Sequence, residues 1–271
     1  MRLANFIAPG EDRARSGHVR DGLVVSFDQD LSVREILAMT ERPYAHGQEF
    51  ALSDVHLLAP YQPRAVFMVG ANYKAHVDAA AKVGKMPDWL APGEIPCLMK
   101  GPGSPVGPHD PIVRPRSISC LDYEGELMVV MGPRGEPAGY AVANDISARD
   151  VGDRWQLTRQ KGGDTFCPWG PWITTAEEVP DPYALWVRTW VDDELRQDGS
   201  TAEMIVRIPE IVEYIQKTIS VAPGDLLLTG TPAGTAAEMV DPRWLEPGQR
   251  VRVEIDGLGS IENTIVAPTE N

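Results

Sequence analysis

Residues 123–132 read YEGELMVVMG, and this stretch decides the fold because it predicts a strand with both faces covered. Residues 127–131 are continuously apolar, which is typical of a central strand. At its start, Glu124 and Glu126 would point to the same face, about 7 Å apart. Two such carboxylates repel each other and are costly to bury unless a cation lies between them. The alternative is an edge strand with both glutamates in solvent, and the pattern alone leaves the choice open.

A third carboxylate follows on the next strand-like segment. Residues 139–147, GYAVANDIS, end their apolar run at Asn144 and Asp145. With no Cys or His beside them, three carboxylates offer only oxygen ligands, which suit a hard cation better than Zn²⁺. If the strand is buried, Glu124, Glu126 and Asp145 could form a metal site with Mg²⁺ or Mn²⁺ as the cofactor, and Ca²⁺ could take that place in crystals.

Strand patterns dominate the chain around this stretch. Short apolar or alternating runs predict further strands at residues 1–7, 22–27, 64–70, 170–175, 185–193, 224–230 and 250–259. Amphipathic patterns predict helices at residues 32–39, 75–86 and 208–219. Strands and helices do not alternate regularly, so a β-rich α+β fold is favoured over a doubly wound sheet.

Composition excludes several classes of function. The formal net charge is −14, and no basic stripe is interleaved with aromatic residues, so we expect no nucleic-acid partner. No apolar run approaches the length of a membrane span, and the first residues do not resemble a signal peptide, so no membrane association is expected. Cys97, Cys120 and Cys167 lie far apart and cannot all pair. A reducing, cytoplasmic location is the natural expectation.

Three further segments carry residues that could do chemistry. His76 lies where a predicted strand passes into a helix and could act as a base, although a single histidine is more often a cap or a surface residue. Lys161, in a Gly-rich loop, could pair with a substrate carboxylate or simply be solvated. Gly230 and Thr231 open a Gly/Pro turn that could bind an anion, although as a bare turn it needs no function.

Taken together and in this order, the segments resemble the fumarylacetoacetate hydrolase family. The motifs are NYxxH at 72–76, DYEGEL at 122–127, GYxxANDxSARD at 139–150, KGxDTFCPxGPWI at 161–173 and GDLLLTGTPAG at 224–234. The resemblance implies a mixed β-sandwich or β-roll fold, with a small N-terminal α/β domain at 1–63, a catalytic domain at 64–271 and a lid at about 76–98. It also implies a homodimer.

The resemblance assigns a function to each residue singled out above. It implies that Glu124, Glu126 and Asp145 bind the metal and that His76 and Lys161 are catalytic. Thr231, Gly230, Tyr73 and Arg149 are then expected to bind the substrate, a small anionic oxo-acid.

Several reactions are compatible with this resemblance. Our first hypothesis is a hydrolase that cleaves a C–C bond in a small 2,4-dioxo acid, such as an acylpyruvate or a compound like fumarylacetoacetate. The alternatives are an isomerase, tautomerase or decarboxylase that acts on a related 2-oxo acid without water, and a binding protein that retains the metal site without catalysis. A metal that stabilises negative charge on the oxo-acid would serve all of these reactions.

The sequence departs from the family near the predicted base. Much of the family has Glu three residues after the histidine, whereas Ala79 stands here. Asp78, Asp88 and Glu94 are the candidate replacements, although Asp78 would point about 100° away on a helix. Gly152 and Gly163 also replace larger residues of the family, and we expect them to enlarge the pocket.

Overall fold

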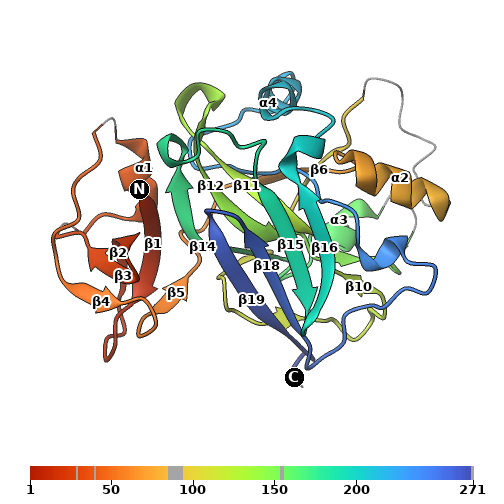
Figure 1. The fold of residues 1–271 in the computed structure, drawn as a ribbon, viewed down its shortest axis with the longest axis horizontal. Coiled ribbons are helices and arrows are strands. Elements are labelled where there is room, and N and C mark those ends of the chain that lie inside the picture. Colours follow the sequence, from red (N-terminus) through yellow and green to blue (C-terminus); the bar gives the residue numbers. More distant parts are fainter. Residues whose placement is uncertain (29, 40, 85–93, 153–155, 270–271) are drawn as a thin grey trace.

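The computed structural model describes residues 1–28, 30–39, 41–84, 94–152 and 156–269, and its strand content confirms the β-rich α+β prediction. Strands form two layers, with a smaller N-terminal unit beside them (Figure 1). None of the helices in these ranges is long and apolar enough to cross a membrane.

The large sheet runs through both the N-terminal unit and the main body. Its order is β4 (Glu49–Ala51), β3 (Leu23–Ser26), β2 (Ala14–Arg20), β1 (Arg2–Ile7), β14 (Cys167–Thr175), β12 (Pro137–Asn144), β11 (Gly125–Met131), β17 (Leu226–Leu228), β6 (Val66–Val69) and β7 (Cys97–Met99), with β5 (His56–Leu58) paired to β1 and β8 (Pro105–Val106) paired to β14. The predicted domain boundary after residue 63 stays a prediction.

A second sheet packs on one face of the large one. Its order is β16 (Glu194–Ser200), β15 (Trp186–Val191), β18 (Arg250–Ile255), β19 (Gly259–Val266) and β9 (Ile112–Val113). Strand β11 contacts β15 and β18, and Leu127 and Val129 of β11 lie in one buried cluster with Val187 and Val253. The odd-numbered residues of β11 therefore face the core between the sheets.

The other face of β11 packs on a different set of residues. Met128 and Val130 lie in a second buried cluster with Leu228 of β17, Met68 of β6 and Ile36 of α1 (Val33–Ala38). The N-terminal unit thus covers part of this face, and α1 is held by a capping box between Ser32 and Glu35. Glu124 and Glu126 are even-numbered like Met128 and Val130, so their side chains point to this second face.

Short elements complete the fold. They are α2 (Lys74–Lys82), α3 (Leu157–Lys161), α4 (Ile208–Gln216), the paired strands β10 (Leu121–Asp122) and β13 (Ser147–Ala148), and the 3₁₀ turns η1 (Pro133–Gly135), η2 (Ala176–Glu178), η3 (Thr201–Glu203) and η4 (Ala236–Glu238). The predicted helices at 75–86 and 208–219 correspond to α2 and α4. Residues 85–93 of the predicted lid lie outside the described residues.

Candidate metal centre

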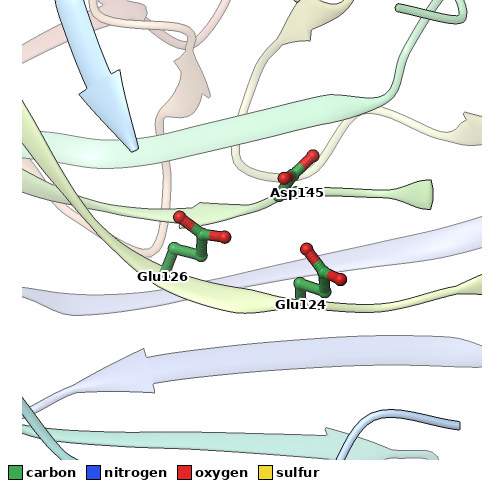
Figure 2. Close-up of side chains that lie close together, drawn as sticks. All are labelled: Glu124, Glu126 and Asp145. Carbon is green, nitrogen blue, oxygen red and sulfur yellow. The ribbon is translucent and has the colours of Figure 1, made fainter. Parts of the chain in front are cut away.

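The three predicted carboxylates converge at one end of β11. Asp145 follows β12 directly across from Glu124, and its backbone N–H donates to the Glu124 carbonyl at 2.8 Å. Glu126 lies two residues further along β11 on the same face. One oxygen from each side chain lies within 4.8 Å of the others, and Figure 2 shows the carboxylates facing a common space.

All three carboxylates are buried, so the edge-strand alternative is wrong. Strand β11 is paired on both sides, to β12 and β17, and the exposed fractions of Glu124, Glu126 and Asp145 are 6%, 1% and 0%. Asp145 Oδ1 forms an ion pair with a buried ammonium group. Three buried carboxylates whose oxygens cluster in this way fit a divalent cation.

The two glutamates differ in their preferred charge. Burial opposes ionisation of Glu124, but Lys161 and Arg149 outweigh it and hold the pKa of this carboxyl below its usual range. Burial, together with the negative charges of Asp145 and Glu124, raises the pKa of Glu126 well above its usual range. The metal-free centre therefore favours a proton on Glu126, which a cation bound there would displace.

Lys161 is not solvated. It is the last residue of α3, rather than part of a loop, and its Nζ lies 2.6 Å from Glu124 and 2.7 Å from Asp145. Burial lowers its pKa, but these two carboxylates outweigh burial, so the pKa is raised and the ammonium form persists. Lys161 therefore places a fixed positive charge beside two of the three candidate ligands.

Lys100, which sequence reasoning missed, supplies a second buried ammonium group. Its Nζ donates to the carbonyls of Phe166 at 2.7 Å and Ile146 at 3.0 Å and pairs with Asp145. The residue follows β7, which pairs with β6, and its ammonium group reaches Asp145 at the end of β12. No local motif marks it, because its partners lie on distant segments of the chain.

Arg149 links the metal centre to the turn η4. Its guanidinium lies 3.0 Å from Asp122 and also pairs with Glu124. Asp122 in turn accepts from the N–H groups of Ala236 at 2.8 Å and Ala237 at 3.2 Å. This chain of contacts fixes η4 against the strand that carries the glutamates.

The structure provides His76 with a carboxylate partner, although Ala79 stands where much of the family has the glutamate. The Nδ1 atom of His76 pairs with Glu238 on η4, and the other carboxylate oxygen of Glu238 accepts from the N–H of Gly234 at 2.5 Å. A carboxylate partner places the proton on Nδ1 of the neutral ring and leaves Nε2 as an acceptor.

The two described residues that the sequence offered as replacements, Asp78 and Glu94, do not make this contact. Asp78 pairs with Lys74, and Glu94 accepts from the Tyr214 hydroxyl. Asp88 lies outside the described residues.

The turn at Gly230 and Thr231 holds Glu126, one of the three candidate metal ligands, in place. The N–H of Gly230 donates to Glu126 at 2.8 Å, and the Thr231 hydroxyl donates to the Gly125 carbonyl at 2.9 Å. Gln197 donates to the Thr231 oxygen at 2.7 Å. These contacts fix the turn against the Glu126 end of β11, and the substrate-binding role of Thr231 stays a prediction.

A cavity of about 200 Å³ opens over the carboxylates. It is lined by eight of the nine predicted site residues, namely His76, Glu124, Glu126, Asp145, Arg149, Lys161, Gly230 and Thr231. The ninth, Tyr73, is fully buried in the core between the sheets and does not line the cavity.

The two replacement glycines do not enlarge this cavity, contrary to our expectation. Neither Gly152 nor Gly163 is among the described residues that line it. A Cβ at Gly163 would lie 2.8 Å from the ring of Phe166, so this glycine makes room for a neighbouring aromatic side chain. Gly152 has a φ of +63°, and a Cβ there would meet Gln156.

Lys100→Met is expected to lower the free energy of unfolding of the metal-free protein by about 3 kcal/mol, because Asp145 and two carbonyls lose a buried donor. Urea unfolding in the presence of a chelator would measure the change. Lys82→Met, which alters an exposed lysine of α2, should shift stability by less than about 0.5 kcal/mol. Equal urea midpoints for the two variants would contradict the structural importance of Lys100.

Comparison with known proteins agrees with the fold. Residues 65–266 match the family model described as fumarylacetoacetate hydrolase C-terminal. Among solved structures, the fumarylacetoacetate hydrolase of Exiguobacterium antarcticum is 33% identical, with a TM-score of 0.84 and coverage of 99% of this chain and 100% of that one.

Two further structures extend the range of activities among the similar proteins. The 2-hydroxyhepta-2,4-diene-1,7-dioate isomerase of Mycobacterium marinum is 32% identical with a TM-score of 0.79, and both chains are covered fully. The maleylpyruvate hydrolase of Sphingobium sp., solved with Mn²⁺ and pyruvate, is 26% identical with a TM-score of 0.77, over 99% of this chain and 100% of that one. The chain therefore belongs to the fumarylacetoacetate hydrolase family.

Proposed function

We propose that the protein is a divalent-metal-dependent hydrolase that cleaves a C–C bond in a small 2,4-dioxo acid. The observation that carries this proposal is the common cavity, which brings three buried carboxylates together with the His76–Glu238 pair. The first group suits a metal, and the second suits the activation of water. The hydrolases among the similar structures, one of them solved with Mn²⁺ and pyruvate, support the same class.

Glu124, Glu126 and Asp145 would hold Mg²⁺ or Mn²⁺, which stabilises negative charge on the oxygens of a 2-oxo acid. The residues around them have separate tasks. Lys161 keeps Glu124 ionised, pairs with Asp145 and adds a positive charge that attracts an anionic substrate. The N–H of Gly230 fixes the orientation of Glu126.

His76 would act as the general base. Glu238 holds its Nδ1 proton, so Nε2 can take a proton from water as the water oxygen attacks the 4-oxo carbon. The bond between C3 and C4 then breaks, C3 receives a proton, and the products are pyruvate and a carboxylic acid. Glu238 stabilises the imidazolium that forms during the attack.

Turnover of acylpyruvates in ¹⁸O-water tests the proposal. We expect one labelled oxygen in the carboxylic acid released from the 4-oxo side, and complete loss of turnover after treatment with a chelator, with recovery on addition of Mg²⁺ or Mn²⁺. Hydrolysis that persists after exhaustive chelation would contradict the metal requirement.

An isomerase or tautomerase is the second candidate, because an isomerase is 32% identical over the whole chain. In that case a dioxo acid or its enol would be converted without label entering a new carboxylate. A decarboxylase would release CO₂ from the same metal-bound class of acid. A ligand-dependent thermal shift without any product would instead favour a binding protein.

We further propose a cytoplasmic homodimer that acts on a small anionic oxo-acid and binds no nucleic acid. No cysteine of the described residues forms a disulfide, which suits a reducing compartment. Sedimentation analysis would establish the number of subunits.

A further inference from the structure

The wall of the cavity beyond the carboxylates is apolar. Met68 of β6 and Leu98 of β7 are paired directly across the two strands, so their side chains lie on the same face of the large sheet. Both line the cavity, together with Leu157 of α3. These three side chains form what we call the apolar wall.

The register of the large sheet connects this wall to the metal centre. Leu228 of β17 pairs with Met128 of β11 on one side and with Met68 of β6 on the other. Glu126 lies two residues before Met128 and therefore projects from the same face as Met68. The cavity thus extends from Glu126, across β17, to the apolar wall.

One glycine leaves this path open. Gly70 lines the cavity at the end of β6. Among the described residues, a Cβ at Gly70 would meet only Pro96, at 3.8 Å, so this side of Gly70 has room for a ligand chain.

Each described cation that lines the cavity already has a carboxylate partner. Lys161 pairs with Glu124 and Asp145, and Arg149 pairs with Asp122 and Glu124. His76 contacts Glu238. Met68, Leu98 and Leu157 cannot donate a hydrogen bond, so a second carboxylate on a substrate would lose water at the wall without gaining a partner among these residues.

We propose that the protein selects oxo-acids whose remote end is an uncharged, apolar chain, which lies over Gly70 against Met68, Leu98 and Leu157. The inference rests on the proposed function, because it assumes that the 2-oxo and carboxylate end of the substrate lies at the metal centre. It restricts the substrate class to monocarboxylic acids with an alkyl tail, and it makes the apolar wall the determinant of specificity.

Binding of 2-oxo acids that cannot be cleaved tests the proposal without catalysis. Calorimetric titration of the Mn²⁺-loaded protein should show affinity rising about fourfold per methylene from 2-oxobutanoate to 2-oxohexanoate. The dicarboxylate 2-oxohexanedioate, which replaces the terminal methyl with a carboxylate, should bind at least about tenfold more weakly than 2-oxohexanoate. Equal or tighter binding of the dicarboxylate would overturn the proposal.

A variant of the wall provides a second test. Leu98→Lys adds a cation at the wall, on a partly exposed residue whose new alkyl stem can cover the same surface. It should shift the preference toward 2-oxohexanedioate by about tenfold. The matched control is Met99→Lys on the next residue of β7, which points to the opposite face and is 43% exposed. An equal shift in both variants, or no shift in Leu98→Lys, would contradict the placement of the tail.

Turnover of a matched pair separates this proposal from the proposed hydrolysis. The pair is 2,4-dioxoheptanoate and 2,4-dioxoheptanedioate, which differ only in the terminal group. Preferential binding of monocarboxylates without cleavage of either compound would contradict hydrolysis and leave the tail assignment standing. Cleavage of both at equal kcat/KM would contradict the tail assignment alone.

Discussion

Glu126→Gln is expected to lower metal-dependent turnover on the order of 10³-fold, while the metal-free protein keeps or gains stability at neutral pH. Activity falls because the substitution removes one of three anionic oxygen ligands at a site that stabilises developing negative charge. Stability does not fall because glutamine resembles the protonated form of Glu126, which the metal-free centre already favours. The amide oxygen can still accept from the N–H of Gly230.

The predicted difference in stability between the variant and the wild type depends on pH in a definite direction. Burial and the neighbouring carboxylates raise the pKa of Glu126 in the folded protein well above that of the unfolded chain. The stability that Glu126 contributes is therefore present at low pH and is lost as the pH rises toward the folded-state pKa. Relative to the wild type, the chelator-treated variant should gain thermal stability between pH 5 and pH 8.

Calorimetry can measure metal affinity and thermal unfolding in the same variant. Glu136→Gln is the matched control, because Glu136 is an exposed glutamate that immediately precedes β12. Its metal affinity and melting temperature should match those of the wild type. Wild-type metal affinity in Glu126→Gln would refute the assignment of Glu126 as a ligand.

The cluster of three carboxylates could be predicted because its geometry follows from local rules. The period of two along β11 places Glu124 and Glu126 on one face, and the apolar run that follows them indicates a buried strand. Pairing of β11 with β12 then brings Asp145 opposite Glu124. What the pattern could not decide was whether β11 lay at an edge, since that depends on β17, which is about 100 residues further along the chain.

Other strands were missed because their sequences are polar. Strands β2 and β16 read ARSGHVR and ELRQDGS, with few β-branched or aromatic residues. Pairing with β1 and β15 stabilises each of them as a strand. In such segments the neighbouring strand, rather than intrinsic propensity, determines the conformation.

The partner of His76 was missed for a related reason. A search for a carboxylate near His76 in the sequence examines only the helix and the residues that follow it. Glu238 lies 162 residues away and reaches His76 because Asp122 and Arg149 fix η4 beside α2. The only local signal was a glutamate in a turn otherwise rich in small residues, and the spacing did not connect it to His76.

The second large expected effect is the loss of activity when His76 or Glu238 is replaced. His76→Ala is expected to lower kcat by about 10²- to 10⁴-fold, because the variant loses the group that accepts a proton from water. Glu238→Gln should lower kcat by about 10- to 100-fold, since the amide can still contact Nδ1 but cannot stabilise the imidazolium that forms. Neither residue is a candidate metal ligand, so metal affinity should stay close to that of the wild type in both.

The double variant decides whether the two residues act together. If Glu238 acts only through His76, the loss in His76→Ala/Glu238→Gln should equal the loss in His76→Ala alone. Glu203→Gln is the matched control, because Glu203 accepts from the N–H of Ala75 at the start of the same helix and does not contact His76. It should retain activity within a factor of about three. Multiplicative losses in the double variant would mean that Glu238 acts independently of the base. The proposal that His76 and Glu238 activate the nucleophilic water as a pair would then be wrong.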